Sequence, residues 1–119
     1  MVERPYQRLV AWKEAHALCL WIYAMTKKYP SCEFFGLVDQ MCRSSSSAPT
    51  NIAEGSVKES KKEQARFNEI ALCSLEEIHY QCLLSFDLHY INAKEKDQSH
   101  DHIGRAGFLI NRLRASCFR

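Results

Sequence analysis

One long segment sets the architecture of this 119-residue chain: SKKEQARFNEIALCSLEEIHYQCLLSFDLHY, residues 60–90. It opens with Ser60 and Glu63, a capping-box pair in which each side chain can satisfy the other residue's free backbone N–H group. Apolar residues then recur every three or four positions and form one seam, made of Phe67, Ile70, Ala71, Leu75, Ile78, Cys82 and Phe86. We therefore predict one helix from Ser60 to about Tyr90, about 45 Å long at the usual rise per residue.

The C-terminal quarter of the chain predicts one more helix. Residues 92–99 (NAKEKDQS) are polar, and we expect a loop there. A fourth helix then starts near Ser99 and runs toward the C-terminus. Its apolar stripe has alternating spacings of three and four residues and consists of Ile103, Ala106, Ile110, Leu113 and Cys117.

A proline interrupts the helical pattern that precedes residue 60. We predict a second helix from about Glu33 to Glu54, with Ser31 capping its start and Gly55 following its end. Pro49 removes one backbone hydrogen bond and clashes one turn back, so we expect a kink near residues 45–47. The run of four serines at 44–47 is also a poor helix former, and the alternative is two helices with a loop at 44–48.

The first predicted helix, from about Gln7 to Tyr29, is apolar on nearly every face. Such a helix needs cover on more than one side, which indicates a subunit interface or a patch for a partner. Four long helices with short links predict an all-α fold, an antiparallel up-and-down four-helix bundle with one domain over residues 1–119.

Composition narrows the class of protein. Apolar residues make up 46% of the chain and charged residues 25%, which is typical of a globular domain and atypical of a disordered one. The longest apolar run, nine residues from Ala17 to Met25, is too short to span a membrane, and the N-terminus lacks the apolar core of a signal peptide. The six cysteines form no CxxC pair. We predict a cytoplasmic protein with reduced thiols and no membrane association.

Polar residues gather on one face of the second helix if that helix is continuous. They are Gln40, Arg43, Ser44, Ser47, Asn51 and Glu54. The common interpretation is a solvated face, and the functional one is a polar strip that lines a groove or channel. Arg43 and Glu54 are eleven residues apart and cannot pair within the helix. Each therefore needs a partner elsewhere, for which the candidates are Arg66, Glu76 and Glu77.

Arginines recur every seven residues along the fourth helix, at Arg105, Arg112 and Arg119. Together with Lys94 and Lys96 they could follow a phosphate backbone, although a solvated face is the commoner reason for such charges. Aromatic residues are sparse among them, with Phe108 alone nearby, so stacking on single-stranded bases gains little support.

Catalytic and metal-binding patterns are weak. Glu76 and His79 form one E-x-x-H motif, whereas di-iron bundles need two such motifs and two further carboxylates. His79 and Cys82 could give two zinc ligands, but no second pair completes a set of four. No phosphate-binding loop or nucleophile elbow occurs in the sequence. We predict a non-enzymatic protein with no metal and no cofactor.

Four blocks carry a family resemblance: LVAWKEAHAL (9–18), YPSCEFFGLVDQM (29–41), APTNIAEGS (48–56) and ARFNEIALCSLEEI (65–78). From Tyr6 to about Ile91, and more loosely to Leu113, the chain resembles the bacterial four-helix-bundle proteins encoded by intervening sequences of large-subunit ribosomal RNA genes. Residues 51–56 (NIAEGS) are the most specific part of the match.

The resemblance implies a homo-oligomer, expected as a pentameric ring or barrel. It extends distantly to the accessory proteins of diversity-generating retroelements, which associate with a reverse transcriptase and nucleic acid. For the family itself the function is unassigned, and RNA or DNA is the partner usually suggested. The family's motif positions fall here on Arg43, Pro49, Asn51, Glu54, Gly55, Arg66 and Glu77. Cys42 stands where the family tends to have a basic residue, and Lys58 where it usually has an arginine. The first change removes a positive charge and the second replaces a guanidinium with an amine, so both weaken the case for nucleic-acid binding.

Two functional hypotheses follow. In the first, a homo-oligomer binds nucleic acid, or a protein that handles it, through Lys58, Arg105, Arg112 and Arg119. In the second, the chain is a scaffold or interaction protein without a nucleic-acid role. A polar network of Arg43, Asn51, Glu54, Arg66 and Glu77 would then hold helices and subunits in register.

Overall fold

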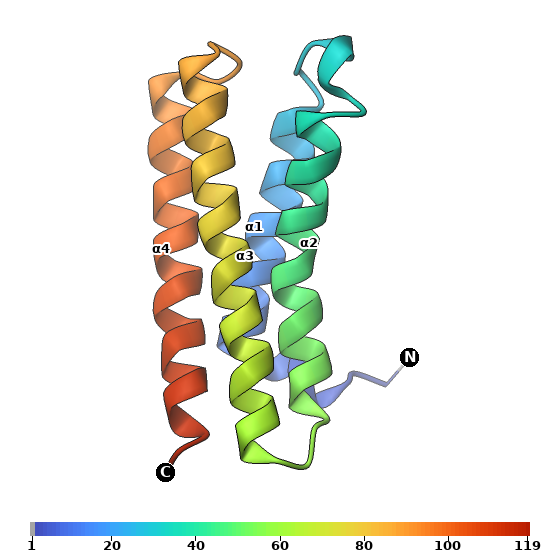
Figure 1. Ribbon diagram of the computed structural model, residues 1–119, viewed down its shortest axis with the longest axis vertical. Coiled ribbons are helices and arrows are strands. Elements are labelled where there is room, and N and C mark those ends of the chain that lie inside the picture. Colours follow the sequence, from blue (N-terminus) through green and yellow to red (C-terminus); the bar gives the residue numbers. More distant parts are fainter. Residues whose placement is uncertain (1) are drawn as a thin grey trace.

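The computed structural model describes residues 2–119 as four helices that run alternately up and down (Figure 1). They are α1 (Val10–Thr26), α2 (Leu37–Ser56), α3 (Lys61–Asp87) and α4 (Ala93–Ser116), with short 3-10 turns at Pro5–Arg8 and Ser31–Glu33. Helices α1 and α3 each pack against both α2 and α4. The predicted all-α four-helix bundle is confirmed.

The apolar seams predicted from the sequence meet in one core. Ala71, Leu75, Ile78 and Cys82 of the α3 seam are buried, and Phe67, Ile70 and Phe86 at its edges are half-buried. All four helices contribute fully buried side chains, the largest of which are Leu18, Ile22, Met41, Ile52, Ile78 and Ile110. Burial of these apolar groups is the main term that stabilises the bundle.

Helix α2 runs without a break through Pro49, so the alternative of a loop at 44–48 is wrong. The serines keep their hydroxyl groups bonded within the helix: Ser44 donates to the Gln40 carbonyl at 2.8 Å and Ser45 to the Cys42 carbonyl at 3.1 Å. Both serines and Pro49 are buried. Packing therefore overrides the low helix propensity of this run. The kink at Pro49 stays a prediction.

The loop expected at residues 92–99 is the start of α4 instead. The Asn92 side chain accepts a hydrogen bond from the Glu95 backbone N–H at 2.8 Å, and Glu95 accepts one from the Asn92 N–H at 2.9 Å. This is a capping box with asparagine in the first position. Glu95 also pairs with Lys28 of the α1–α2 connection. Burial opposes the charge on Glu95, but the bonds from Lys28 and Asn92 lower the pKa of its carboxyl group.

Four other helix ends lie inside the predicted limits. Helix α1 starts at Val10 rather than Gln7 and ends at Thr26 rather than Tyr29. Helix α2 starts at Leu37, because residues 31–33 form a separate 3-10 turn. Helix α3 ends at Asp87, and His89 then takes a positive φ of 65°, which turns the chain toward α4.

A glycine in the last turn of α2 allows a close contact with α3. We expect Gly55→Ala to lower the free energy of unfolding by about 1–3 kcal/mol, as overpacking does in well-packed sites. The new Cβ would lie 2.8 Å from the Cβ of Phe67, which is fixed to the backbone and cannot rotate away. Urea denaturation followed by circular dichroism measures the change.

The matched control is Gly104→Ala on α4, where an added Cβ meets no atom within 4 Å. This variant should gain about 0.5–1 kcal/mol from helix propensity alone. Equal stability of the two variants would contradict a close contact at Gly55.

Candidate functional site

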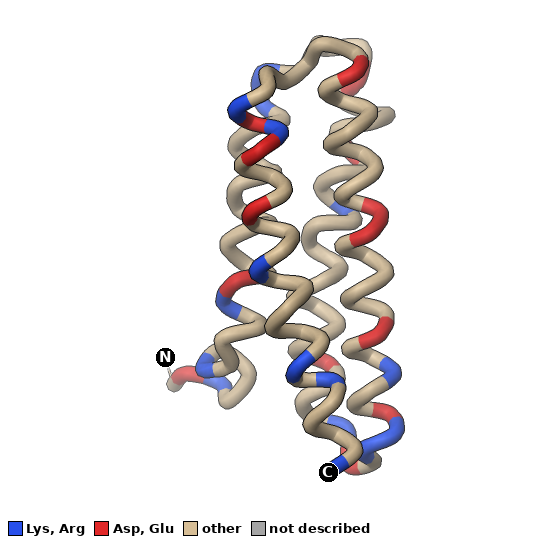
Figure 2. Tube along the Cα trace, turned by 90° about the vertical axis from the view of Figure 1, so that its left-hand side faces the viewer, with Lys and Arg blue, Asp and Glu red and all other residues tan. Residues whose placement is uncertain are grey.

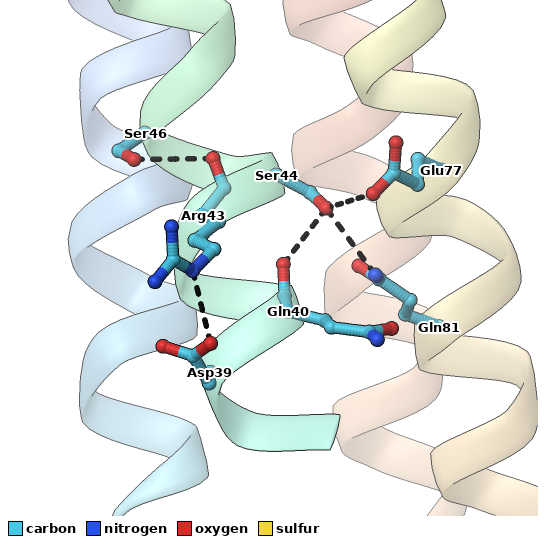
Figure 3. Close-up of polar contacts among 7 residues, drawn as sticks. All are labelled: Asp39, Gln40, Arg43, Ser44, Ser46, Glu77 and Gln81. Carbon is cyan, nitrogen blue, oxygen red and sulfur yellow. Dashed lines mark hydrogen bonds and ion pairs between the residues drawn. The ribbon is translucent and has the colours of Figure 1, made fainter. Parts of the chain in front are cut away.

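A row of polar groups joins α2 to α3. The Gln81 amide donates to the Ser44 hydroxyl oxygen at 3.2 Å, and the Ser44 hydroxyl also contacts the Glu77 carboxylate (Figure 3). Ser44 has one hydroxyl proton, so it donates to either Glu77 or the Gln40 carbonyl at any moment. Farther along, the Ser74 hydroxyl donates to the Ser47 hydroxyl oxygen at 2.8 Å. We call Ser44, Ser47, Ser74, Glu77 and Gln81 the α2–α3 polar seam.

Asn51 supports this seam from within α2. Its amide donates to the Ser47 carbonyl at 2.8 Å and to the Ser47 hydroxyl oxygen at 3.0 Å. It makes no hydrogen bond to another helix in residues 2–119. Asn51 therefore orients Ser47 toward Ser74 rather than joining two helices directly.

The expected partners of Arg43 and Glu54 are not found on α3. Arg43 pairs with Asp39 of its own helix, with 2.9 Å between Nε and Oδ2, because a carboxylate one turn away is closer than any on α3 (Figure 3). Glu54 is exposed, and its carboxylate forms no hydrogen bond or ion pair within residues 2–119. Arg66 pairs with Glu63 of α3 at 3.0 Å. Of the five residues in the expected network, Glu77 alone bonds across the α2–α3 contact.

Two members of the polar seam escaped the sequence analysis. Ser74 and Gln81 are buried, and Glu77 lies between them in the sequence. The spacing 74, 77 and 81 follows the three-four helical pattern and places all three on one face of α3. That pattern was available in the sequence, but the apolar seam of the same helix masked it.

Basic side chains concentrate at the end of the bundle that holds both chain termini. Residues 2–9, 54–66 and 112–119 meet there and carry nine Lys and Arg against four Asp and Glu (Figure 2). A cleft at this end is lined from all three segments, by Leu9, Gly55, Lys61 and Cys117 among others. We call these three segments the basic end. The rest of the chain has more acids than bases, because the whole chain has a net charge of only +2.

The candidate nucleic-acid contacts fall into two groups. Lys58, Arg112 and Arg119 lie at the basic end and form no ion pair within residues 2–119. Arg105 lies farther along α4, where its Nε is 3.5 Å from the Glu14 carboxylate of α1. Lys94 and Lys96 lie in the first turn of α4, at the opposite end of the bundle, so they do not continue the arginine stripe as expected.

Three of the six thiols are shifted away from the character of a nucleophile. Burial raises the pKa of the Cys19, Cys42 and Cys82 thiols, that of Cys82 to about 11. A thiol nucleophile requires the opposite shift. No group of three or more His, Cys, Asp or Glu in residues 2–119 is arranged to hold a metal ion. None of the helices in this range combines the length and the apolar character that crossing a bilayer requires.

Comparison with known proteins gives one family and one fold. A family model described as 23S rRNA-intervening sequence protein matches residues 7–112. No curated protein matches the chain significantly. The chain is similar to a crystal structure, at 1.70 Å resolution, of a protein of unknown function from the S23 ribosomal protein family of Bacteroides thetaiotaomicron VPI-5482. The two share 20% identity and a TM-score of 0.82 over 89% of this chain and 96% of that one. This likeness shows the fold alone.

The α2–α3 polar seam should matter for stability at Ser44. We expect Ser44→Ala to lower the free energy of unfolding by about 1–3 kcal/mol, because it leaves the buried Gln81 amide without its partner. The side-chain Oε1 of Gln81 is already buried without a hydrogen bond. Ser46→Ala is the matched control, because Ser46 bonds only to the Arg43 carbonyl one turn away. It should change stability by less than about 0.5 kcal/mol. A similar loss in both variants, measured by urea denaturation, would refute the role of Ser44.

Proposed function

Because the chain belongs to the 23S rRNA intervening sequence protein family, we propose that it acts as a non-enzymatic homo-oligomer that binds nucleic acid through its basic end. The observation that carries this proposal is the excess of five positive charges at the basic end of a chain with a net charge of only +2. We place the protein in the cytoplasm, where its six free cysteines would stay reduced.

The basic end supports contacts to phosphate groups. Lys and Arg provide most of the affinity for nucleic acid by displacing counterions from the phosphate backbone. Lys58, Arg112 and Arg119 are exposed and have no carboxylate partner within residues 2–119. Their charges are therefore available to a ligand, whereas Arg66 and Arg114 already contact Glu63 and Glu69.

The outer side of α1 supports self-association. Leu20 and Tyr23 are 57% and 47% exposed, and Phe34 of the α1–α2 connection is 44% exposed. Tyr23 and Phe34 line a largely apolar groove between α1 and α2. A second copy would remove this surface from water, and the family resemblance favours a ring of five. Copies packed side by side would place all their basic ends on one rim, where the charges add.

A scaffold without a nucleic-acid role is the second candidate. The observation that favours it is the same apolar surface on α1, which suits a protein partner equally well. In this hypothesis the motif positions Arg43, Asn51, Glu54, Arg66 and Glu77 serve helix packing and subunit register. The two candidates differ in whether nucleic acid binds.

Nucleic-acid binding should depend on salt and on the basic end. We expect labelled RNA to bind in fluorescence anisotropy, with an affinity that falls steeply between about 50 and about 200 mM salt. Arg112→Ala/Arg119→Ala should weaken binding about tenfold or more at low salt and reduce the salt slope by about one to two. The control Lys94→Ala/Lys96→Ala removes the same charge from the opposite end and should bind as the wild type does. An absence of binding at low salt would leave only the scaffold candidate.

Self-association should depend on the outer side of α1. Light scattering should give a particle of about five times the 13.8 kDa chain. Leu20→Ser/Tyr23→Ser should lower this mass, because it removes apolar area from the contact. Tyr80→Ser/Leu83→Ser changes two exposed apolar residues of α3 and should keep the mass. A wild-type particle of 13.8 kDa at micromolar concentration would contradict self-association.

A further inference from the structure

The later part of α4 and the residues after it carry basic side chains and no acidic ones. Residues 102–119 contain four arginines and no Asp or Glu. Arg105, Arg112 and Arg119 are all exposed, and Arg105 keeps 54% of its side chain exposed despite its contact with Glu14. Arg105 and Arg112, seven residues apart on α4, are separated by about 10 Å along the helix axis, and Arg119 follows three residues after the end of the helix. A row of cations with this spacing complements an extended polyanion.

Two exposed aromatic rings belong to the same segment of the chain as these arginines. Phe108 and Phe118 are 61% and 65% exposed. Phe108 alone was expected from the sequence. Phe118 is a second exposed ring, because α4 ends at Ser116 and the residues after it leave this side chain in solvent. The Arg112 guanidinium lies 5.7 Å from the centre of the Phe108 ring, within the range of a cation–π contact. An exposed ring beside an arginine offers a face on which a base can stack.

A shallow cleft lies beside this row. It is about 290 Å³ in volume and is lined by Val10, Leu109 and Leu113 together with Arg112 and Arg119. Five of its eight lining residues are apolar, and two are arginines. This combination offers an apolar surface to a planar ring and a positive charge to the phosphate next to it.

We propose that Arg105, Phe108, Arg112, Phe118 and Arg119 form a strip that binds single-stranded nucleic acid. The arginines bind phosphates, and the two phenyl rings stack on bases. The strip is about 20 Å long, which suits a short single strand of about four nucleotides. The inference rests on the nucleic-acid binding proposed above and specifies its surface and its substrate class.

The exposed rings favour a single strand over a duplex. In a duplex the base faces are stacked on one another, so a phenyl ring beside the phosphate backbone finds no base to stack on. In a single strand every base has a free face, and stacking on an aromatic side chain is then favourable for any sequence. Arginines alone would bind both forms.

The experiment compares a labelled single strand of about 12 nucleotides with its duplex, as RNA and as DNA, by fluorescence anisotropy on the full chain. Wild type should bind the single strand more tightly. Phe108→Leu/Phe118→Leu keeps the charge and the apolar character but removes both rings, and should weaken single-strand binding about tenfold or more. Its duplex binding should stay unchanged. The control Tyr80→Leu removes an equally exposed ring from α3 and should match the wild type on both probes.

Three results would refute the proposed strip without refuting nucleic-acid binding itself. They are tighter wild-type binding to the duplex, an unchanged single-strand affinity in the double phenylalanine variant, and an equal loss in the Tyr80→Leu control. A lower oligomer mass of the phenylalanine variant in light scattering would also overturn the strip, because it would assign the rings to a subunit contact. Failure of the wild type to bind any probe would instead remove the proposed function.

Discussion

The close contact between α2 and α3 depends on small side chains. A Cβ at Gly55 would lie 2.8 Å from Phe67, and along the same contact two serine hydroxyls, Ser47 and Ser74, bond to each other at 2.8 Å. Small residues bring the two backbones close, and the hydroxyl groups then satisfy one another instead of water. Helices α1 and α4 pack on the two sides of this pair. We therefore expect these polar pairs to favour one register of α2 on α3, whereas a purely apolar contact would leave the two helices free to slide.

That register also assembles the charged surface. The α2–α3 pairing brings the turn that carries Lys58 next to the first residues of the chain and the end of α4. None of these segments is strongly basic alone, apart from the C-terminal one. Together they form the basic end, so the charge pattern is a property of the fold as much as of the sequence.

The sequence predicted the fold well and the polar contacts poorly. Apolar residues that recur every three or four positions lie on one side of a helix, and that side is the buried one, so all four helices could be predicted from this pattern. The polar segment at residues 92–99 was misread because its capping box begins with Asn92 rather than serine or threonine. Arg43 was misassigned because a carboxylate one turn away, Asp39, competes with every partner on another helix. The exposure of Phe118 depends on where α4 ends, which the sequence does not mark.

Charge separates the two exposed apolar surfaces of the bundle. On α1, Leu20 and Tyr23 have uncharged neighbours at Ala17 and Ala24, and Lys27 is the charged residue that lines the groove beside Tyr23, so a second copy would cover a mainly apolar surface. The exposed rings of α4 belong to a segment rich in arginine. If this face paired with the same face of a second copy, guanidinium groups would lie opposite each other in a contact from which water is excluded. Repulsion of this kind costs several kcal/mol for like charges, roughly as much as burial of two phenyl rings gains. A polyanion removes the repulsion and uses the rings at the same time, which is why we assign α1 to self-association and α4 to nucleic acid.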